Sequence, residues 1–231
     1  MSFKCPLAPA GANPALVLQT LPLSAGTKLF RFHGTTYGAD TFNPNTGRRI
    51  EVPEDGARFN PFPGAPADNI GTLYAADTFE AAALESVFHA VEHVPSPDFP
   101  RVQLADWRYS RLEVTQDLVL LELVNPRLRQ LPVRGRKASI SEGELIHSPP
   151  GQYPNTRTWA RFLHASMPGL AGLAWRPRLG GTGQAFVFFG DRCRSGVLEA
   201  KSKPIPVAVG PGYQQLCRVA RAASIRMIGP A

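Results

Sequence analysis

The sequence has 231 residues, of which 43% are hydrophobic and 19% charged, which predicts one large globular domain, or a domain with extensions, with a real core. No stretch reaches the roughly 18 consecutive apolar residues of a membrane-spanning helix, so no membrane partner is expected. The net charge is +7, but the positive residues are mostly arginines spread along the chain. This favours a phosphate-bearing ligand or an acidic protein over direct contact with nucleic acid.

The N-terminal segment and the cysteines give information on where in the cell the protein is expected to be. Residues 1–27 are rich in Pro and Ala and are expected to form a loosely structured arm, without the basic and apolar regions of a signal peptide. Residues 28–231 are expected to form a single domain. The three cysteines, Cys5, Cys193 and Cys217, provide neither a disulfide framework nor a CxxC metal site. Together they indicate a reducing, cytoplasmic location.

The first half of the domain is predicted to carry two strands, a long loop and one long helix. Residues 29–33 and 72–75 are the strands, and residues 34–66 between them are rich in Gly, Pro, Asn and Asp. A capping box of Asp77 and Glu80 predicts a helix that starts near Thr78 and is stopped by Pro95. Its apolar face is predicted from spacings of three and four residues, at Leu84, Val87, Phe88 and Val91.

The second half is predicted to alternate irregularly between strands and helices. Residues 117–124, 172–175 and 185–189 are apolar enough for buried strands, and 205–209 is an edge strand between prolines. Residues 157–167 and 213–223 are predicted to be helical. Because the order lacks a regular βαβ alternation, an α+β fold is expected rather than a doubly wound α/β fold.

Four polar side chains in apolar or loop surroundings suggest a chemistry. Cleaving the bond between nicotinamide and ribose in NAD needs no general acid, because nicotinamide leaves as a neutral base from an oxocarbenium-like ribose. The protein must provide a carboxylate near the ribose, an aromatic wall and guanidinium groups for the diphosphate side. We interpret Glu85 as the carboxylate, Tyr74 as the wall and Arg31 and Arg58 as the cations.

Several sequence blocks follow one another between residues 29 and 192. They are LFRFH with Arg31, the FNP and RFNP segments at 42–44 and 58–61, LYAADTFEAAALESVFH with Tyr74 and Glu85, and GLAWRPRLGGTGQAFVFFGDR at 172–192. The order of these blocks resembles the RES-domain family, the NAD-consuming toxins of bacterial toxin–antitoxin modules.

This resemblance implies an ADP-ribosyltransferase-like fold, with a split, mostly antiparallel sheet and flanking helices around a central cleft. It implies that Glu85, Tyr74 and Arg31 are catalytic and that the same three residues and Arg58 bind NAD. NAD would be a substrate, with no further cofactor and no metal. The expected reaction is hydrolysis, phosphorolysis or transfer of ADP-ribose to a protein, and the expected partner is a helical antitoxin with a DNA-binding region.

Two alternatives remain open. The serine of the family's closing block falls on Pro177, which has neither a hydroxyl nor an N–H group, so a catalytically weakened module that binds NAD or an antitoxin is one alternative. His89, Glu92 and His93 match the H-x-x-E-H pattern of zinc enzymes, so a zinc metalloenzyme is the other, with Glu142 or Glu144 as a third ligand.

Overall fold

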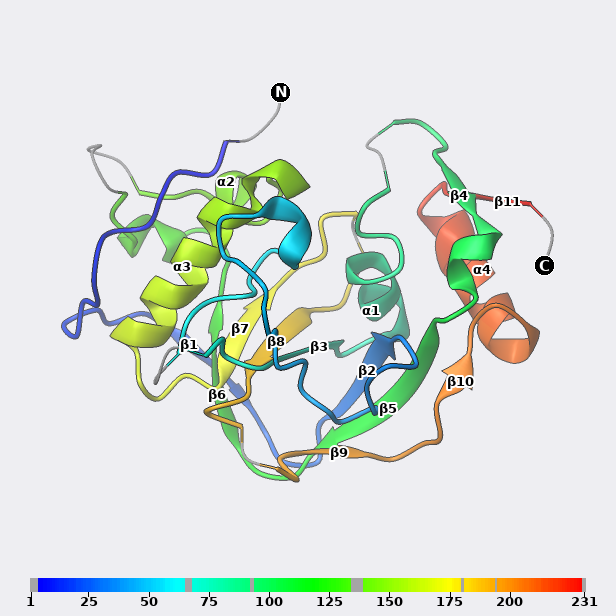
Figure 1. Ribbon diagram of the computed structural model, residues 1–231, viewed down its shortest axis with the longest axis horizontal. Helices are drawn as coiled ribbons and strands as arrows, with labels where there is room; N and C mark the ends of the chain where they lie inside the picture. The colour runs from blue at the N-terminus through cyan, green and yellow to red at the C-terminus, as the bar shows by residue number, and fades with distance from the viewer. Residues whose placement is uncertain are drawn as a thin grey trace.

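The computed structural model describes residues 4–64, 68–91, 94–133, 139–179, 181–193 and 195–229. Within these ranges the chain forms a nine-stranded sheet, a separate two-stranded sheet and four α helices (Figure 1). The α+β class and the mostly antiparallel sheet with flanking helices are therefore confirmed. The strands of the large sheet are β1 (Thr20–Leu23), β2 (Lys28–His33), β3 (Thr72–Ala76), β5 (Arg108–Val114), β6 (Leu118–Glu122), β7 (Gly172–Trp175), β8 (Ala185–Phe189), β9 (Leu198–Ala200) and β10 (Ile205–Pro206). The small sheet pairs β4 (Asp98–Pro100) with β11 (Arg226–Ile228), and the helices are α1 (Phe79–Glu85), α2 (Glu142–Leu145), α3 (Tyr153–Ser166) and α4 (Gly210–Ala222).

The large sheet is weakly joined at one point in its middle. Its strand order is β1-β6-β7-β8-β3-β2-β5-β10, with β9 beside β5, and only β6 and β7 run parallel. Neighbours such as β2 and β5 pair over six residues, whereas β2 and β3 share the single pair Phe30 and Ala76. Beyond that pair the two strands diverge. The divergence splits the sheet into two halves and opens a gap that the chain lines with polar residues.

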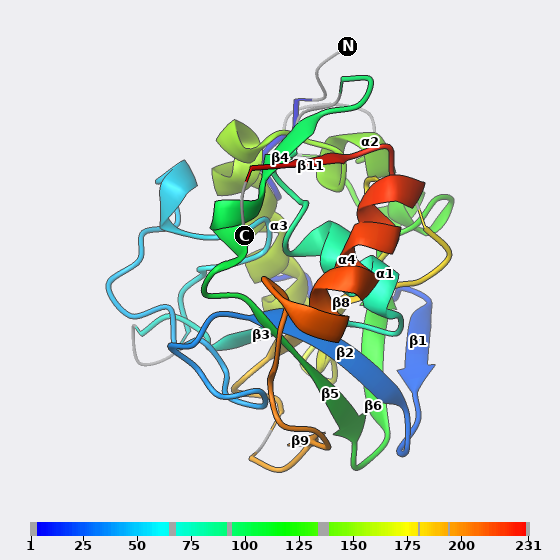
Figure 2. The same ribbon diagram turned by 90° about the vertical axis from the view of Figure 1, so that its right-hand side faces the viewer.

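The helices cover the two halves of the sheet separately. Figure 1 shows α2 and α3 beside β6 and β7, and α1 and α4 at the opposite end near β2 and β10. The view in Figure 2 places α1 and α4 next to each other over β2 and β5. Trp159 of α3 belongs to one buried cluster with Val187 of β8, and Leu84 of α1 to a second with Leu216 of α4. The opposite face of the sheet buries a third cluster that includes Leu73 and Phe188.

Helix α1 is shorter than its apolar spacing predicts. It ends at Glu85, although Val87, Phe88 and Val91 are buried as expected. The Phe88 N–H bonds to the carbonyl of Ala83, five residues earlier, which closes the helix. The long helix was a wrong prediction because apolar spacing reports which residues are buried, and an irregular turn buries them equally well.

The N-terminus of α1 also differs from the prediction. The cap is Thr78, whose hydroxyl accepts a hydrogen bond from the Ala81 N–H at 3.1 Å, and not the Asp77 capping box. Asp77 instead accepts from the Gln184 N–H at 2.8 Å, and this contact joins the start of the helix to the start of β8.

The Thr78→Ala substitution is expected to lower the free energy of unfolding by about 1 kcal/mol, because a helix N–H loses its acceptor. Urea unfolding followed by circular dichroism measures this change. Thr78→Ser, which keeps the hydroxyl, is the control and should stay near the wild-type value. Equal losses in both variants would contradict the assignment of Thr78 as the cap.

Most other predicted elements are confirmed with small shifts. Strand β8 matches its predicted range, while α3 begins at Tyr153, with Pro154 in its first turn. The edge strand shortens to β10, two residues long. The arm predicted for residues 1–27 contains β1, which pairs with β6 at the edge of the sheet, and Leu18, which is buried in the core. Among the described residues, none of the helices has the length and apolar character needed to cross a membrane.

Candidate functional site

A cleft of about 260 Å³ opens where β2 and β3 diverge. Its walls come from the end of β2, from β3, from the turn that follows α1 and from the loop between β2 and β3. The residues that line it are Arg31, Phe32, His33, Gly34, Tyr37, Asn43, Arg48, Ala57, Asn60, Thr72, Tyr74, Glu85, Ser86, His89 and Trp107. Three of the four residues predicted from the sequence, Arg31, Tyr74 and Glu85, therefore share one cleft. The fourth, Arg58, forms an ion pair with Glu85 at 3.0 Å.

Three donors hold the carboxylate of Glu85, the last residue of α1. Its Oε2 atom accepts hydrogen bonds from Arg58 Nη1 and Trp175 Nε1, both at 3.0 Å. Its Oε1 atom accepts from the main-chain N–H of Arg178 at 2.9 Å. Because a carboxylate offers about four lone-pair positions, these contacts leave one acceptor position on Oε1 for a ligand.

Arg58 and Glu85 form a buried ion pair. Their side chains are only 6% and 8% exposed. Burial is the largest influence on the Arg58 guanidinium and acts to lower its pKa, but the charge and hydrogen bond of Glu85, together with Tyr153 and Tyr74, raise the pKa overall. The guanidinium also lies 5.5 Å from the centre of the Tyr153 ring. Arg58 therefore stays positively charged, and its charge is paired with the Glu85 carboxylate.

Helix α3 holds the loop that carries Arg58. The hydroxyl of Thr156 donates to the Arg58 carbonyl, and the buried guanidinium of Arg157 donates to the Ala57 carbonyl at 3.1 Å. The same guanidinium donates to the carbonyl of Val52 at 2.6 Å and to that of Pro53 at 2.8 Å. The hydrogen bonds from Arg157 thus satisfy carbonyls of this loop, and they hold the loop in place.

Tyr74 lies in the middle of β3, with its ring against Trp175 at a centroid distance of 6.0 Å. Its hydroxyl accepts a hydrogen bond from the Phe59 N–H at 3.2 Å. Burial strongly raises the pKa of Tyr74, so the phenol keeps its proton at neutral pH and can act as a donor.

Arg31 of β2 lines the same cleft as Glu85. It alternates along β2 with Phe30 and Phe32, whose rings contact Phe79 of α1, so its side chain leaves the strand on the other face. Its Nη1 atom donates to the carbonyls of Ala39 and Thr41, at 2.7 and 2.9 Å. Burial lowers the pKa of Arg31 to about 10. The structure thus uses Arg31 to hold the loop that follows β2.

His33, which no sequence pattern pointed to, is buried and lines the cleft. Its Nδ1 atom lies 3.0 Å from the Gly34 carbonyl and its Nε2 atom 3.0 Å from Ser110 Oγ. Because a carbonyl only accepts, Nδ1 carries the proton in the neutral ring and Nε2 accepts from the serine. Burial lowers the pKa of His33, and it likewise lowers the pKa values of His147 and His164.

These three histidines predict a loss of stability in acid. Their pKa values are lower in the folded protein than in the unfolded chain, so the unfolded chain binds more protons below about pH 6.5. The free energy of unfolding should therefore fall as the pH drops from 7.5 to 5.5, as measured by urea titration. His33→Gln should flatten this dependence, and an unchanged slope in that variant would contradict the assignment for His33.

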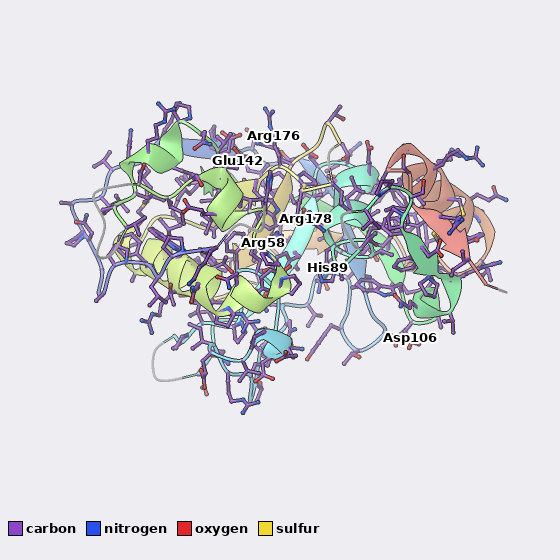
Figure 3. All side chains as sticks on the ribbon, turned by 90° about the horizontal axis from the view of Figure 1, so that it is seen from above. Arg58, His89, Asp106, Glu142, Arg176 and Arg178 are labelled. Carbon is purple, nitrogen blue, oxygen red and sulfur yellow. The ribbon has the colours of Figure 1, made fainter. Side chains whose placement is uncertain are left out.

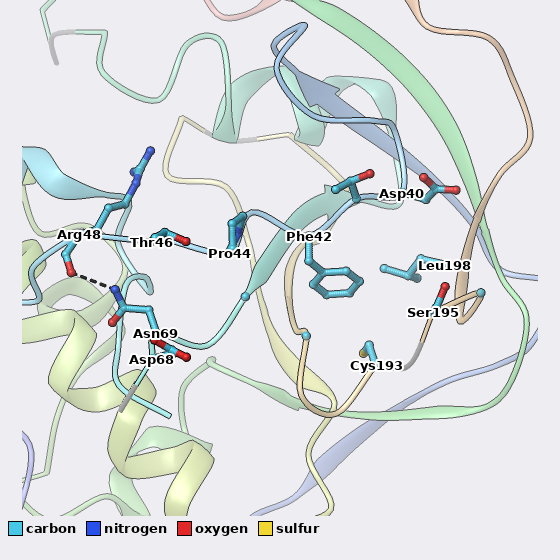
Figure 4. A pocket seen from close by; sticks show the side chains of 15 residues that line it. Asp40, Phe42, Pro44, Thr46, Arg48, Asp68, Asn69, Cys193, Ser195 and Leu198 are labelled. Atoms are coloured by element: carbon cyan, nitrogen blue, oxygen red, sulfur yellow. Dashed lines mark hydrogen bonds between the residues drawn. The ribbon is translucent and has the colours of Figure 1, made fainter. Parts of the chain in front are cut away.

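A second, larger hollow of about 1110 Å³ lies between residues 40–48 and 190–198 (Figure 4). Phe42, Leu198 and Cys193 line it together with Asp40 and Asp68. Neither Glu85 nor Tyr74 lies there, so its size does not make it the better candidate site. Arg48 lines both hollows; it is exposed, and its Nη1 atom donates to the Asp55 carbonyl at 3.0 Å.

The sequence did not point to Arg48, nor to two partners of Glu85, Trp175 at the end of β7 and Arg178 just after it. Both partners lie in the block GLAWRPR, so the block itself was the available signal. Pro177 is buried between them, and the N–H that reaches Glu85 belongs to Arg178.

His89 does not have the helical position that the zinc alternative requires. A pair of ligands spaced four residues apart needs a helix, and α1 ends before His89, whose Nδ1 atom lies 2.7 Å from the Ser86 carbonyl. Glu92 and His93 lie outside the described residues. Within the described ranges, no group of three His, Cys, Asp or Glu side chains is arranged to hold a metal ion.

The arrangement offers a fixed carboxylate, a protonated phenol and, at the rim, an arginine. Such a set can accept a hydrogen bond from a hydroxyl and stabilise positive charge that develops beside it. Figure 3 shows Arg58, Arg178 and His89 near one another at the centre of the molecule.

Comparison with protein families agrees with the resemblance noted in the sequence. The family model of the RES domain matches residues 28–209, which is most of the chain. A comparison with curated proteins found no match.

Proposed function

Because the chain belongs to the RES domain family, we propose that it cleaves NAD at the bond between nicotinamide and ribose, as the toxin of a toxin–antitoxin module. The family is associated with NAD-related activity and with such modules. The observation that carries the proposal is the buried Glu85 carboxylate, held by three donors with one acceptor position left on Oε1 beside the cleft.

The proposed reaction needs no protein nucleophile. The C–N bond breaks, nicotinamide leaves with the electron pair as a neutral base, and positive charge develops on the ribose. Glu85 Oε1 accepts a hydrogen bond from a ribose hydroxyl, and its negative charge favours the cationic ribose. A water molecule then bonds to the anomeric carbon and loses its proton to solvent. Phosphate or a protein side chain would take the place of water in the other two versions.

The aromatic and cationic groups are given separate roles in this proposal. Tyr74 orients the nicotinamide ring, and its phenol donates a hydrogen bond to the ligand. Arg58 acts through Glu85, and Arg31 through the loop that it holds. The exposed guanidinium of Arg48, at the edge of the cleft, is the better candidate for the diphosphate, because its charge faces solvent and a fork of N–H groups suits phosphate oxygens.

The substitution at Pro177 supports a second candidate, a module that binds NAD without cleaving it. The use of three of the four acceptor positions of Glu85 by the protein itself also favours this candidate. Against it, Pro177 does not interrupt the contact with Glu85, since the donor is the next residue along the chain.

The proposed partner is a helical antitoxin with a DNA-binding region, whose tail would occupy the cleft. A cytoplasmic location is part of this proposal and rests on the three free cysteines. Co-expression with a small helix-turn-helix protein encoded by a neighbouring gene should suppress the toxicity of this chain and NAD loss in the cell. Unchanged NAD loss would argue against such a partner.

Purified protein incubated with NAD tests the proposed reaction. Release of nicotinamide with ADP-ribose, with ADP-ribose 1″-phosphate or with a modified protein would identify water, phosphate or protein as the acceptor. Turnover that persists with a chelator would separate this reaction from the zinc alternative. Tight NAD binding without nicotinamide release would favour the silent module, and absence of binding would refute both.

A further inference from the structure

The segment that follows α1 is fastened by a residue from a distant part of the chain. Helix α1 ends at Glu85, so the carbonyl groups of the next turn lack helical N–H partners. Arg178, which follows β7, donates from Nη2 to the carbonyl of His89 at 3.1 Å and to that of Val91 at 3.2 Å. One guanidinium therefore binds the turn that leads away from Glu85.

The same residue reaches the carboxylate by a second route. The main-chain N–H of Arg178 donates to Glu85 Oε1 at 2.9 Å. The Arg178 side chain is hydrogen-bonded to the turn after Glu85, and its main-chain N–H is hydrogen-bonded to Glu85 itself. A shift of either contact would therefore displace the other. Oε1 is also the oxygen with the free acceptor position, and its direction depends on this contact.

The neighbouring arginine provides a contrast. Arg176 is exposed, and Figure 3 shows it projecting to the edge of the molecule, whereas Arg178 lies next to His89 and near Arg58. Both arginines are positively charged and lie in the segment after β7. Of the two, Arg178 is the one that is hydrogen-bonded to Glu85 and to the turn after α1.

We infer that Arg178 is a positioning residue, whose guanidinium anchors the turn after β7 so that its own N–H keeps Glu85 Oε1 directed into the cleft. This inference rests on the proposed function, since Glu85 is the group that Arg178 aligns. Without the guanidinium, residues 176–179 lose their anchor to the 89–91 turn. The carboxylate then keeps its ion pair with Arg58 but loses its fixed orientation.

The kinetic test compares Arg178→Ala with the matched control Arg176→Ala in a nicotinamide-release assay. Because a displacement of about 1 Å can cost roughly 100-fold in rate, we expect kcat to fall about 10- to 100-fold in Arg178→Ala, with KM changed by less than about two-fold. Arg176→Ala should stay within about two-fold of wild type in both constants. Arg178→Lys, whose ammonium keeps the charge and N–H donors but lacks the planar fork of a guanidinium, should recover part of kcat.

A double-mutant comparison separates alignment from general damage. In the Glu85→Gln background, Arg178→Ala should lower the residual rate little further, because there is no carboxylate left to align. An equal loss in both backgrounds, or equal losses in the two arginine variants, would overturn the inference.

A readout without turnover keeps the inference testable if the proposed reaction is wrong. Urea unfolding of the wild type, both single variants and the double variant should show non-additive losses, since Arg178 and Glu85 are in contact. Additive losses would overturn the positioning role. Non-additive losses in a wild-type protein that releases no nicotinamide would instead show that the contact stands and that the proposed function fails.

Discussion

Glu85→Gln is expected to lower kcat for nicotinamide release by at least about 100-fold, because it removes the negative charge that faces the developing cation. The amide keeps the size of the side chain and one acceptor oxygen, so NAD binding should weaken much less than turnover. Nicotinamide release under single-turnover conditions, with calorimetric titration of NAD, measures both effects.

The fold of this variant has to be compared with that of a matched control. The amide turns a donor towards Arg58, Trp175 or Arg178, so some loss of stability is expected along with the loss of rate. Glu80→Gln, on the same helix but outside the cleft, removes the same charge and should keep near-wild-type kcat. Full activity in folded Glu85→Gln would refute the proposed role of the carboxylate.

Arg58→Met is expected to lower the free energy of unfolding by about 3–5 kcal/mol, because it leaves the Glu85 carboxylate buried without its cation. The remaining donors, Trp175 Nε1 and the Arg178 N–H, place the loss towards the lower end of that range. Urea unfolding at pH 7.5 measures it. As a control, Arg161→Met replaces an exposed arginine of α3 and should change stability by less than about 0.5 kcal/mol.

The double variant Arg58→Met/Glu85→Gln makes this prediction specific to the pair. Removing both charges leaves no uncompensated buried ion, so the double variant should be more stable than Arg58→Met alone. If instead the two losses simply add, the ion pair is not the reason for the cost, and the support of the loop by α3 would be the remaining explanation.

Two residues that were selected from the sequence lie together at the candidate site. Tyr74 and Glu85 were selected as polar residues in apolar surroundings, and they line one cleft. The choice of guanidinium groups for the diphosphate is less well supported, because Arg58 is paired with Glu85 and Arg31 donates to loop carbonyls. Arg48, which shares the cleft and is exposed, carries no sequence signal that separates it from other loop arginines.

By itself, the sequence determined the buried strands, the α+β class and the residue types of the site, because apolar spacing and punctuation by Gly and Pro are local properties. Only the tertiary structure decided where α1 ends and which donors hold Glu85. Those donors lie 27 residues before it, at Arg58, and 90 residues after it, at Trp175. A hydrogen bond between such distant residues depends on how β3, β7 and α1 pack together, and no local pattern encodes that packing.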